Sequence, residues 1–450
     1  MRSVLQRKNL RHRPVFPWRY LSLFVLLMAL TYFLAADKLA AQEDASEGLE
    51  GGSAIYLPTI FRAEPPPPPA MQELRGLWVT RFDWTSFGQP ASPSKIDEIV
   101  DNADFAGFNA IFFQVRGTAD AYYAPGLEPW AQRVSGGSLG QAPNPFWDPL
   151  AYFVQKAHAA GIELHAYINV YPVWDCGSAP ASNTSPRHFY WDLRDIHGTT
   201  NGLLNGLQWN TSYQLSCSGY QRATPASIDV DNHLIAVGQD LVNRYDIDGI
   251  HLDHIRYGAS NASCDPVSES RWGGDCFTSG YADWQRAQVS GTVNRFYDDI
   301  ILANSGLALS AAVWPIYIDY WGWGGLQGYH TYYQDSKAWV AGGYIDIISP
   351  MIYPSTFNCP DNSFWTFSRW QTLVADFQSD ANGRYVVPGI GTGYCTFSEI
   401  ENRIEAARAI GTAGHALFSY SSLLSHGYFD DLANGPYAEP AVVPPINWHN

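Results

Sequence analysis

The stretch Tyr245-Asp246-Ile247-Asp248-Gly249-Ile250-His251-Leu252-Asp253-His254-Ile255-Arg256-Tyr257 decides the fold of this chain. Ile250 and Leu252 alternate with His251 and Asp253, which is the period of a β-strand with one apolar and one polar face. In an α/β protein the apolar face of such a strand packs on helices, and polar side chains at its C-terminal end point into a site. Asp253 is therefore the first candidate for a functional carboxylate.

Working outward from this strand, apolar strand patterns alternate with helical patterns along most of the chain. Strands are predicted at residues 75–81, 109–116, 162–171, 247–257, 308–317, 345–353, 385–391 and 415–420. Helices are predicted between them at residues 93–106, 149–160, 225–245, 281–304, 332–341, 364–378 and 398–410, with a short one to close. Eight βα units predict an α/β protein with a (β/α)8 TIM barrel. The long loops after strands two to five place the site at the C-terminal ends of the strands.

The competing fold is a doubly wound sheet. Such a sheet would carry a glycine-rich phosphate turn after its first strand. The chain has Val79-Thr80-Arg81-Phe82-Asp83-Trp84 at that place. The sequence therefore favours the barrel.

The chain divides into four segments by composition. Residues 1–41 combine a basic start with an apolar run, which predicts a signal peptide or an N-terminal membrane anchor and hence a secreted or extracytoplasmic protein. Residues 42–72 are rich in Glu, Gly and Pro and predict a linker. Residues 73–437 carry the barrel pattern, and residues 438–450 are predicted to form a Pro-rich tail.

The composition also limits the partners. A formal net charge of −16 disfavours nucleic acid. Seventeen Trp and 27 Tyr exceed the needs of a core, and flat rings with a polar edge suit the stacking of sugar rings. A polysaccharide is therefore the expected partner; no cofactor is predicted, and the oligomeric state stays open.

The six cysteines predict disulfides. In an exported chain an even number without metal-binding spacing indicates a disulfide framework, although six cysteines allow fifteen pairings. All six fall in predicted loops at one end of the barrel. Pairing within a loop or between adjacent loops would join Cys176 to Cys217, Cys264 to Cys276, and Cys359 to Cys395. Such bonds would stiffen the loops that build a site.

Polar side chains converge on the predicted barrel axis. Barrel interiors are usually filled by branched apolar residues, so polar groups there indicate a polar ligand. The inward positions are Gln114 and Arg116 on strand two, His165, Tyr167 and Asn169 on strand three, His251 and Asp253 on strand four, Trp314 towards the end of strand five and Tyr353 at the end of strand six.

Several motifs, in order, resemble the glycosyl-hydrolase-like 10 family of secreted bacterial proteins. They are Glu73-Leu74-Arg75-Gly76-Leu77-Trp78-Val79-Thr80, the segment 107–116, the segments 120–125 and 127–130, Asp148-Pro149-Leu150, the segment 157–169, Asp248-Gly249-Ile250-His251-Leu252-Asp253 and Ser349-Pro350-Met351-Ile352-Tyr353. The resemblance covers most of the folded region and implies a (β/α)8 barrel that acts on glycosidic bonds. One branch of the family is associated with glycan strands of the bacterial cell wall. His254 departs from the pattern, because many members have Asp or Tyr there.

Cleavage of a glycosidic bond needs two carboxyl groups, one ionised and one able to donate a proton. Asp253 is the expected nucleophile or base. Asp335 and Asp120 are the leading candidates for its partner, ahead of Glu128 and Asp319. Gln114, Arg116, His165, Asn169 and His251 are expected to bind substrate, and Trp130, Trp174, Trp314 and Tyr353 are candidates for stacking on sugar rings.

Two other functions fit the same residues. His165, His251 and Asp253 could hold zinc as in a metal-dependent polysaccharide deacetylase, although no helical His pair or Cys cluster reinforces that site. A barrel that binds carbohydrate without cleaving it is the second, because no obvious second carboxylate follows Asp253.

Overall fold

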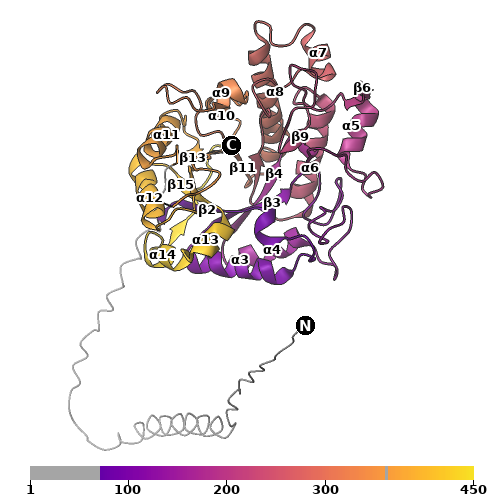
Figure 1. Cartoon of the computed structure of the whole chain (residues 1–450). Helices are drawn as coiled ribbons and strands as arrows, with labels where there is room; N and C mark the ends of the chain where they lie inside the picture. Colours follow the sequence, from indigo (N-terminus) through magenta and orange to yellow (C-terminus); the bar gives the residue numbers. More distant parts are fainter. Residues whose placement is uncertain (1–70, 360–362, 450) are drawn as a thin grey trace, which may run out of the picture. The chain divides into compact units, whose positions relative to one another are not determined.

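A parallel sheet lies at the centre of the computed structural model, which describes residues 71–359 and 363–449 (Figure 1). Within these residues the sheet has nine strands in the order β13-β12-β11-β10-β4-β3-β2-β15-β14. Their bounds are β2 Leu74–Val79, β3 Ala110–Arg116, β4 Glu163–Asn169, β10 Gly249–Asp253, β11 Ala308–Val313, β12 Ile347–Pro350, β13 Tyr385–Val386, β14 Gly389–Gly391 and β15 Gly414–Phe418. Each of the eight predicted strand segments overlaps at least one of these strands, which confirms the α/β class.

The predicted strand at residues 385–391 is divided in two. Pro388 has no N–H group to donate to a neighbouring strand, so the hydrogen-bonded ladder is interrupted there. On one side of the break, the N–H of Val387 donates to the carbonyl of Ile348 beside β12 at 3.0 Å. On the other side, the carbonyl of Pro388 accepts from Ala416 in β15 at 3.0 Å. Val387 and Pro388 alone thus separate β13 from β14, which stand at opposite ends of the strand order.

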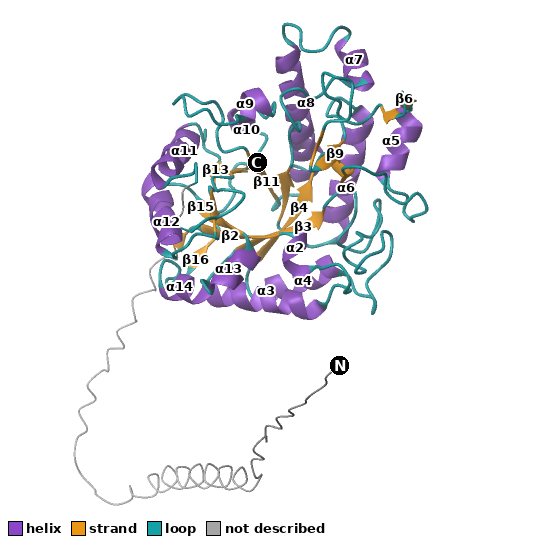
Figure 2. Ribbon diagram, in the orientation of Figure 1, coloured by secondary structure: helices purple, strands orange, loops and turns teal. Residues whose placement is uncertain are grey.

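Helices follow the strands, as Figure 2 shows, with the strands inside and most helices around them. Those that connect successive strands are α3 Pro93–Ala106, α4 Pro149–Ala159, α6 Ile228–Arg244, α8 Tyr281–Phe296 with the π-helical turn η1 Tyr297–Ile301, α10 Ser336–Gly342, α11 Phe367–Ser379 and α12 Ser398–Ile410. After β15 come α13 Tyr420–His426 and α14 Phe429–Asn434. Gly107 and Gly411 end α3 and α12 with φ of 84° and 83°, a left-handed conformation that favours glycine. The predicted alternation of strand and helix is confirmed.

The loops after the strands carry further elements that the periodicity did not predict. They are α2 Arg81–Trp84, β5 Pro172–Asp175, α5 Phe189–His197, β6 Thr199–Thr200, β7 Leu203–Leu204, β8 Cys217–Ser218, β9 Tyr220–Arg222, α7 Pro266–Trp272 and α9 Gly328–Thr331. Most are two to seven residues long. Elements this short do not complete enough periods of an apolar pattern to be recognised.

Apolar side chains pack on both faces of the sheet. One core cluster, which includes Trp78, Phe112 and Tyr167, lies on the face that holds His251. A larger cluster packs the other face against the helices. The ring of Phe112 stacks on His251 with centroids 4.4 Å apart. The polar inward positions therefore lie among aromatic rings.

The C-terminal residues, predicted as a tail, lie against the N-terminal ends of the strands. β16 Ala441–Val442 pairs in parallel with β1 Met71–Gln72. Trp448 Nε1 donates to Oδ1 of the buried Asp346 at 2.6 Å, and His449 Nε2 lies 2.8 Å from the same oxygen. This segment is thus bonded to the end of the sheet opposite the predicted site.

The three predicted disulfides are confirmed: Cys176–Cys217, Cys264–Cys276 and Cys359–Cys395. All six cysteines lie in segments that follow the C-terminal ends of sheet strands, as expected. Disulfides of this kind are typical of proteins that fold in an oxidising compartment. In the part of the chain that the structure describes, no helix has the length and hydrophobicity needed to cross a bilayer. The predicted leader and most of the predicted linker lie outside the described residues.

Candidate active site

A cavity of about 710 Å³ opens at the carboxyl ends of the parallel strands. Its walls come from the ends of β2, β4, β10 and β15 and from loops that follow the strands. The lining residues include Trp78, Asp83, Gln114, Tyr167, Asn169, Asp253, His254, Arg256, Trp314, Tyr353, Trp365 and Phe418. The cavity therefore lies at the end of the sheet where the loop lengths placed the site.

Asp253, the last residue of β10, borders this cavity with 9% of its surface exposed. The Tyr167 hydroxyl donates to Oδ2 at 2.6 Å, the His254 main-chain N–H donates to Oδ1 at 2.5 Å, and Arg256 Nη1 lies 3.3 Å from Oδ1. Burial opposes ionisation, but His254, Arg256 and these hydrogen bonds outweigh it and lower the pKa of Asp253 well below its usual range. Asp253 is a charged carboxylate at neutral pH, as a nucleophile or base must be.

His254 follows Asp253 in a backbone conformation that residues with side chains rarely adopt, with φ of +50°. Its Nε2 lies 4.0 Å from Oδ2 of Asp253, and its Nδ1 is buried without a hydrogen-bond partner in the described residues. Burial lowers the pKa of His254 to about 3, so the imidazole is neutral at pH 7. Strain of this kind is concentrated at functional sites. His254 thus has both a strained backbone and a ring nitrogen, Nδ1, that could form a hydrogen bond with a ligand.

Asp83 is the other carboxylate among the described residues that line the cavity. It lies in α2, where its Oδ2 accepts from the Thr80 N–H at 2.6 Å and from the Thr80 hydroxyl at 2.7 Å. Its Oδ1 accepts from the Ser421 N–H at 3.0 Å and from the Ser419 hydroxyl at 3.3 Å. These bonds form a capping box for α2 and fix the carboxylate at the wall.

The two predicted partner acids, Asp335 and Asp120, do not line this cavity. Asp335 caps α10, where its Oδ1 accepts from the Ala338 N–H at 3.4 Å and from the Tyr317 hydroxyl at 2.6 Å. Asp120 accepts from the Thr118 N–H at 2.7 Å and borders a smaller, adjoining cavity. Burial raises the pKa of Asp120. Both acids therefore lie outside the cavity that holds Asp253.

Glu128 and Asp319, the other two acids considered, are also engaged elsewhere. Glu128 forms a buried bidentate ion pair with Arg116, with Nε and Nη2 each 2.8 Å from a carboxylate oxygen. His233 Nε2 lies 2.8 Å from the same carboxylate. Burial opposes ionisation, but Arg116 and His233 lower the pKa of Glu128 to about 2. Asp319 accepts main-chain N–H bonds within its own loop.

Arg116, predicted to bind substrate, is not among the residues that line the cavity. It is 1% exposed, and besides Glu128 its Nη1 donates to main-chain carbonyls of the loop after β4, including that of Val170 at 3.0 Å. A guanidinium with this set of partners has little left to offer a ligand. Its position instead ties β3 to the loop that follows the neighbouring strand.

His251 and His165 lie beneath the cavity, on the inner face of the sheet. The Trp78 indole donates to His251 Nε2 at 3.0 Å, and His251 Nδ1 lies 2.8 Å from the Ser310 hydroxyl. Burial lowers the pKa of His251 to about 3. His165 Nε2 lies 3.2 Å from Glu163, near the opposite end of the strands. Because both ring nitrogens of His251 are bonded, the zinc set predicted from these two histidines and Asp253 does not come together here.

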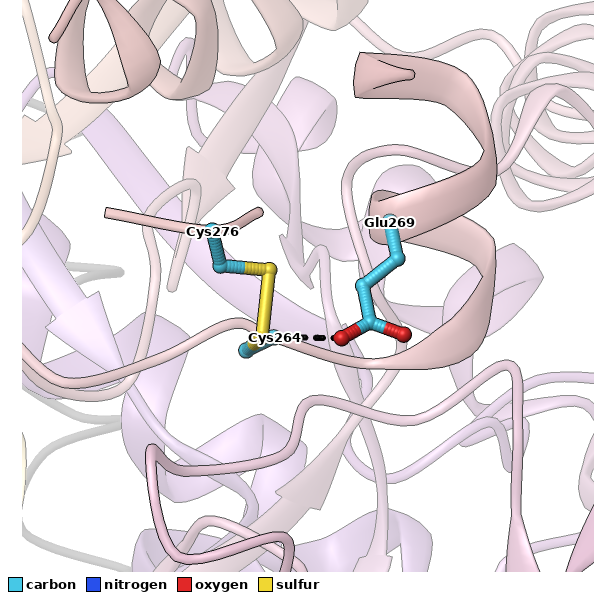
Figure 3. A group of neighbouring side chains, drawn as sticks. All are labelled: Cys264, Glu269 and Cys276. Atoms are coloured by element: carbon cyan, nitrogen blue, oxygen red, sulfur yellow. Dashed lines mark hydrogen bonds between the residues drawn. A yellow bond between two sulfur atoms is a disulfide. The ribbon is translucent and has the colours of Figure 1, made fainter. Parts of the chain in front are cut away.

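Within the described residues, Cys264, Glu269 and Cys276 form the one cluster of three potential metal ligands, with their ligand atoms within 4.8 Å of one another. Figure 3 shows that the two sulfur atoms are joined in the Cys264–Cys276 disulfide, with a carboxylate oxygen of Glu269 3.4 Å from Cys264 Sγ. A disulfide offers no thiolate to a metal. The cluster is therefore a loop closed by a disulfide.

Four of the predicted substrate-binding residues do line the cavity: Gln114, Asn169, Trp314 and Tyr353. Asn169 Oδ1 is buried without a partner in the described residues, so it can accept a hydrogen bond from a ligand. The Tyr353 ring lies parallel to Phe418 with centroids 4.9 Å apart. Trp130 is 6% exposed and lies outside the lining. The cavity thus combines flat rings with free polar atoms.

The sequence interpretation assigned no role to several of the lining residues, among them Trp78, Arg81, Asp83, Tyr167 and Arg256. Tyr167 shares the polar face of β4 with His165 and Asn169, so the strand period did contain its signal. Arg256 lies three positions after Asp253. The position of Asp83 depends on the helix α2, which is too short to be recognised from a periodic pattern.

The structural neighbours include glycoside hydrolases. The glycoside hydrolase domain of PgaB (BpsB) from Bordetella bronchiseptica superposes with a TM-score of 0.53 at 12% identity, over 80% of this chain and 98% of that one. The α-L-fucosidase isoenzyme 2 of Paenibacillus thiaminolyticus superposes with a TM-score of 0.54 at 14% identity, over 81% and 49%. At such identities the likeness concerns the fold.

Fold and site together define a glycoside hydrolase-like protein. The chain belongs to the glycosyl hydrolase-like 10 family, whose model matches residues 73–376. Glycosyl hydrolase DigH of Escherichia coli O6:H1 is 27% identical over 327 residues, which cover 66% of this chain and 67% of that protein. Glycosyl hydrolase YngK of Bacillus subtilis strain 168 is 24% identical over 413 residues, which cover 84% and 74%. The family resemblance predicted from the motifs is confirmed.

Proposed function

We propose that this chain is an exported glycoside hydrolase that cleaves glycosidic bonds in a polysaccharide, with Asp253 as the carboxylate that attacks the sugar or activates water. The observation that carries the proposal is the ionised Asp253 carboxylate at the end of β10, facing a cavity lined by Trp314, Tyr353 and Phe418. Flat rings hold a sugar and a charged oxygen meets its anomeric carbon. A cell-wall glycan is the first substrate to test.

The proposal includes a closed (β/α)8 barrel. The sheet order begins with β13 and ends with β14, which are consecutive in the chain. The first part is bonded to β12 and the second to β15, so the segment 385–391 bridges the two edges. Eight strand segments, each followed by a helix, fit such a ring. Ring closure would bring the loops after β2 and β10 to one mouth.

We further propose Asp83 as the second carboxylate, because it is the other acid that lines the cavity in the described residues. Asp83→Asn should lower kcat by about a hundredfold or more, since a carboxyl group that transfers a proton contributes on that order. Thr80→Val removes the hydroxyl bonds of this capping box, keeps the carboxylate and its bond from the main-chain N–H of residue 80, and should cost less than about tenfold. Equal losses in the two variants would show that Asp83 serves only the α2 cap.

The lowered pKa of Asp253 predicts an acid-tolerant enzyme. A carboxylate whose pKa is depressed in the folded state stays ionised well below the unfolded value of about 3.9. Its contribution to stability is complete above that value and is lost as pH falls through the folded pKa. The acid limb of the kcat/KM profile should therefore lie below about pH 4. Initial rates between about pH 3 and pH 8 measure this limb. A half-maximal rate on the acid side near pH 6 would contradict an ionised Asp253 as the essential base.

Export rests on the leader-like segment 1–41 and on the three disulfides. The function is tested by incubating the purified protein with a panel of polysaccharides, peptide-free cell-wall strands included, and measuring new reducing ends with and without a chelator. Chelator-insensitive release supports the hydrolase. Chelator-sensitive release of acetate would support the deacetylase, and retention of a glycan without turnover would support a binding protein.

A further inference from the structure

A second cavity of about 310 Å³ adjoins the one that holds Asp253. Arg81, Phe82 and Tyr220 line both cavities, so these three residues form the wall between them. Phe87, Arg133 and Trp174 complete the far side of the second cavity, together with Asp120 and Gln132. The two cavities therefore form one continuous run of lining residues across the loops that follow β2, β3 and β4.

Two phenylalanines at this rim are exposed, which is unusual for apolar rings this large. Phe82 is 58% exposed and Phe87 is 59% exposed. The Arg133 guanidinium lies over both rings, 4.9 Å from the centroid of Phe82 and 4.7 Å from that of Phe87. The Arg81 guanidinium lies over Phe82 at 4.5 Å. Cation–π contacts of this kind hold the rings in place, and more than half of the surface of each residue stays exposed.

Phe82, Phe87 and Arg133 form a platform, and further contacts hold this platform in place. Arg133 Nε donates to the Thr85 hydroxyl at 2.9 Å, and Nη2 donates to the Thr85 carbonyl at 2.7 Å. Phe87 stands in a turn closed by the bridge between Ser86 and Gln89. No carboxylate of the described residues pairs with Arg81 or Arg133, whereas most other arginines have such a partner. The rings are held in place, and no carboxylate neutralises the two guanidinium groups. A ligand could therefore bind them with little further loss of conformational entropy.

Aromatic rings also lie on the other side of Asp253, because β10 stands between β4 and β11 in the sheet. Trp365 lines the Asp253 cavity, and Phe364 packs edge-on against it with centroids 5.0 Å apart. Trp323 lies 6.4 Å from Phe364 and stacks on Trp321 at 4.6 Å. The Asp253 cavity thus has aromatic rings beyond it in the loops after β11 and β12, in addition to the platform beside α2.

We propose that the second cavity, with Phe82, Phe87 and Arg133, is an outer subsite that binds a further sugar unit of the same polysaccharide. This inference rests on the proposed function. With rings also on the Trp365 side, the chain extends beyond the reacting bond in both directions, so bonds inside the polysaccharide are cleaved rather than terminal ones. Face-on contact with the phenyl rings and hydrogen bonds from the guanidinium groups suit a pyranose ring.

Phe87→Ala tests the outer subsite, because Phe87 lines the second cavity and not the one that holds Asp253. The matched control is Phe105→Ala on α3, a phenylalanine with the same exposure (57%) that lines neither cavity. The probes are peptide-free cell-wall glycan strands fractionated by length and a length series of chitin oligosaccharides. We expect Phe87→Ala to lower kcat/KM on long chains roughly three- to tenfold, mainly through KM, and to leave the shortest cleaved chain unaffected. Phe105→Ala should match the wild type at every length.

The possible outcomes separate the two proposals. If the wild type cleaves a probe and Phe87→Ala matches it at all lengths, the outer subsite is wrong and the proposed function stands. If Phe87→Ala loses activity equally on short and long chains, its effect comes through the Asp253 cavity and the subsite is again overturned. If the wild type neither cleaves nor retains any probe in affinity electrophoresis, both fail. Long fragments as first products support internal cleavage, and release of single terminal units contradicts it.

Discussion

Asp253→Asn should lower kcat by about a thousandfold or more while leaving the protein folded. The amide keeps the shape of the carboxylate and one oxygen that can accept the bond from Tyr167, now 2.6 Å from Oδ2. The variant loses the negatively charged oxygen that, in the proposal, attacks the anomeric carbon or activates water. Initial rates on the polysaccharide found by the panel measure the loss, and the thermal midpoint should stay within about 4 °C of the wild type.

Asp335→Asn is the matched control for that variant. Asp335 also accepts a hydrogen bond from a tyrosine hydroxyl at 2.6 Å, from Tyr317, but it caps α10 outside the Asp253 cavity. We expect it to retain activity within about twofold and to keep nearly all of its stability, because Asn caps a helix about as well as Asp. Wild-type turnover by Asp253→Asn, or a larger loss in Asp335→Asn, would reverse the assignment of the two acids.

Arg116→Met should destabilise the fold by about 3–5 kcal/mol, because it leaves the Glu128 carboxylate buried without its main counter-charge. Both side chains are 1% exposed, so water cannot replace the lost partner. The free energy of unfolding from urea titration measures the effect. Adding Glu128→Leu should recover part of the loss, since removing both charges of a buried pair is far less costly than removing one.

Arg187→Met provides the exposed counterpart of this experiment. Arg187 pairs with Asp192 and Asp195 at the surface with 40% of its side chain exposed, and removal of such a solvent-screened pair should change the free energy of unfolding far less than removal of the buried one. If Arg116→Met were as stable as Arg187→Met and instead lost only substrate affinity, the predicted substrate-binding role of Arg116 would be restored.

The fold could be predicted because its signals are local and repeated. Each strand and helix of the barrel pattern carries its own apolar period, and α3 and α12 have the bounds that were predicted for them. The disulfide pairings followed once the loops were placed. The break at Pro388 also had a visible cause, the missing N–H, but its consequence for strand pairing depends on which neighbours lie on each side.

The candidate site could be predicted only in part, because a strand period gives the face of a side chain and not its depth. His165 and Asp253 both face inward, yet one lies near the beginning of the strands and the other at their end. Arg116 was expected to meet substrate, but Glu128, twelve positions later, folds back to neutralise it. Contacts between residues on irregular loops leave no periodic trace in the sequence.

The pairing of β1 with β16 has a consequence for how the protein meets a large polymer. Because β1 immediately precedes the first strand of the sheet, Met71 lies at the end of the sheet remote from Asp253. Attachment of the protein to a bead through that side would leave the Asp253 cavity unobstructed. If the proposed activity holds, the immobilised protein should then digest insoluble material as readily as short soluble chains.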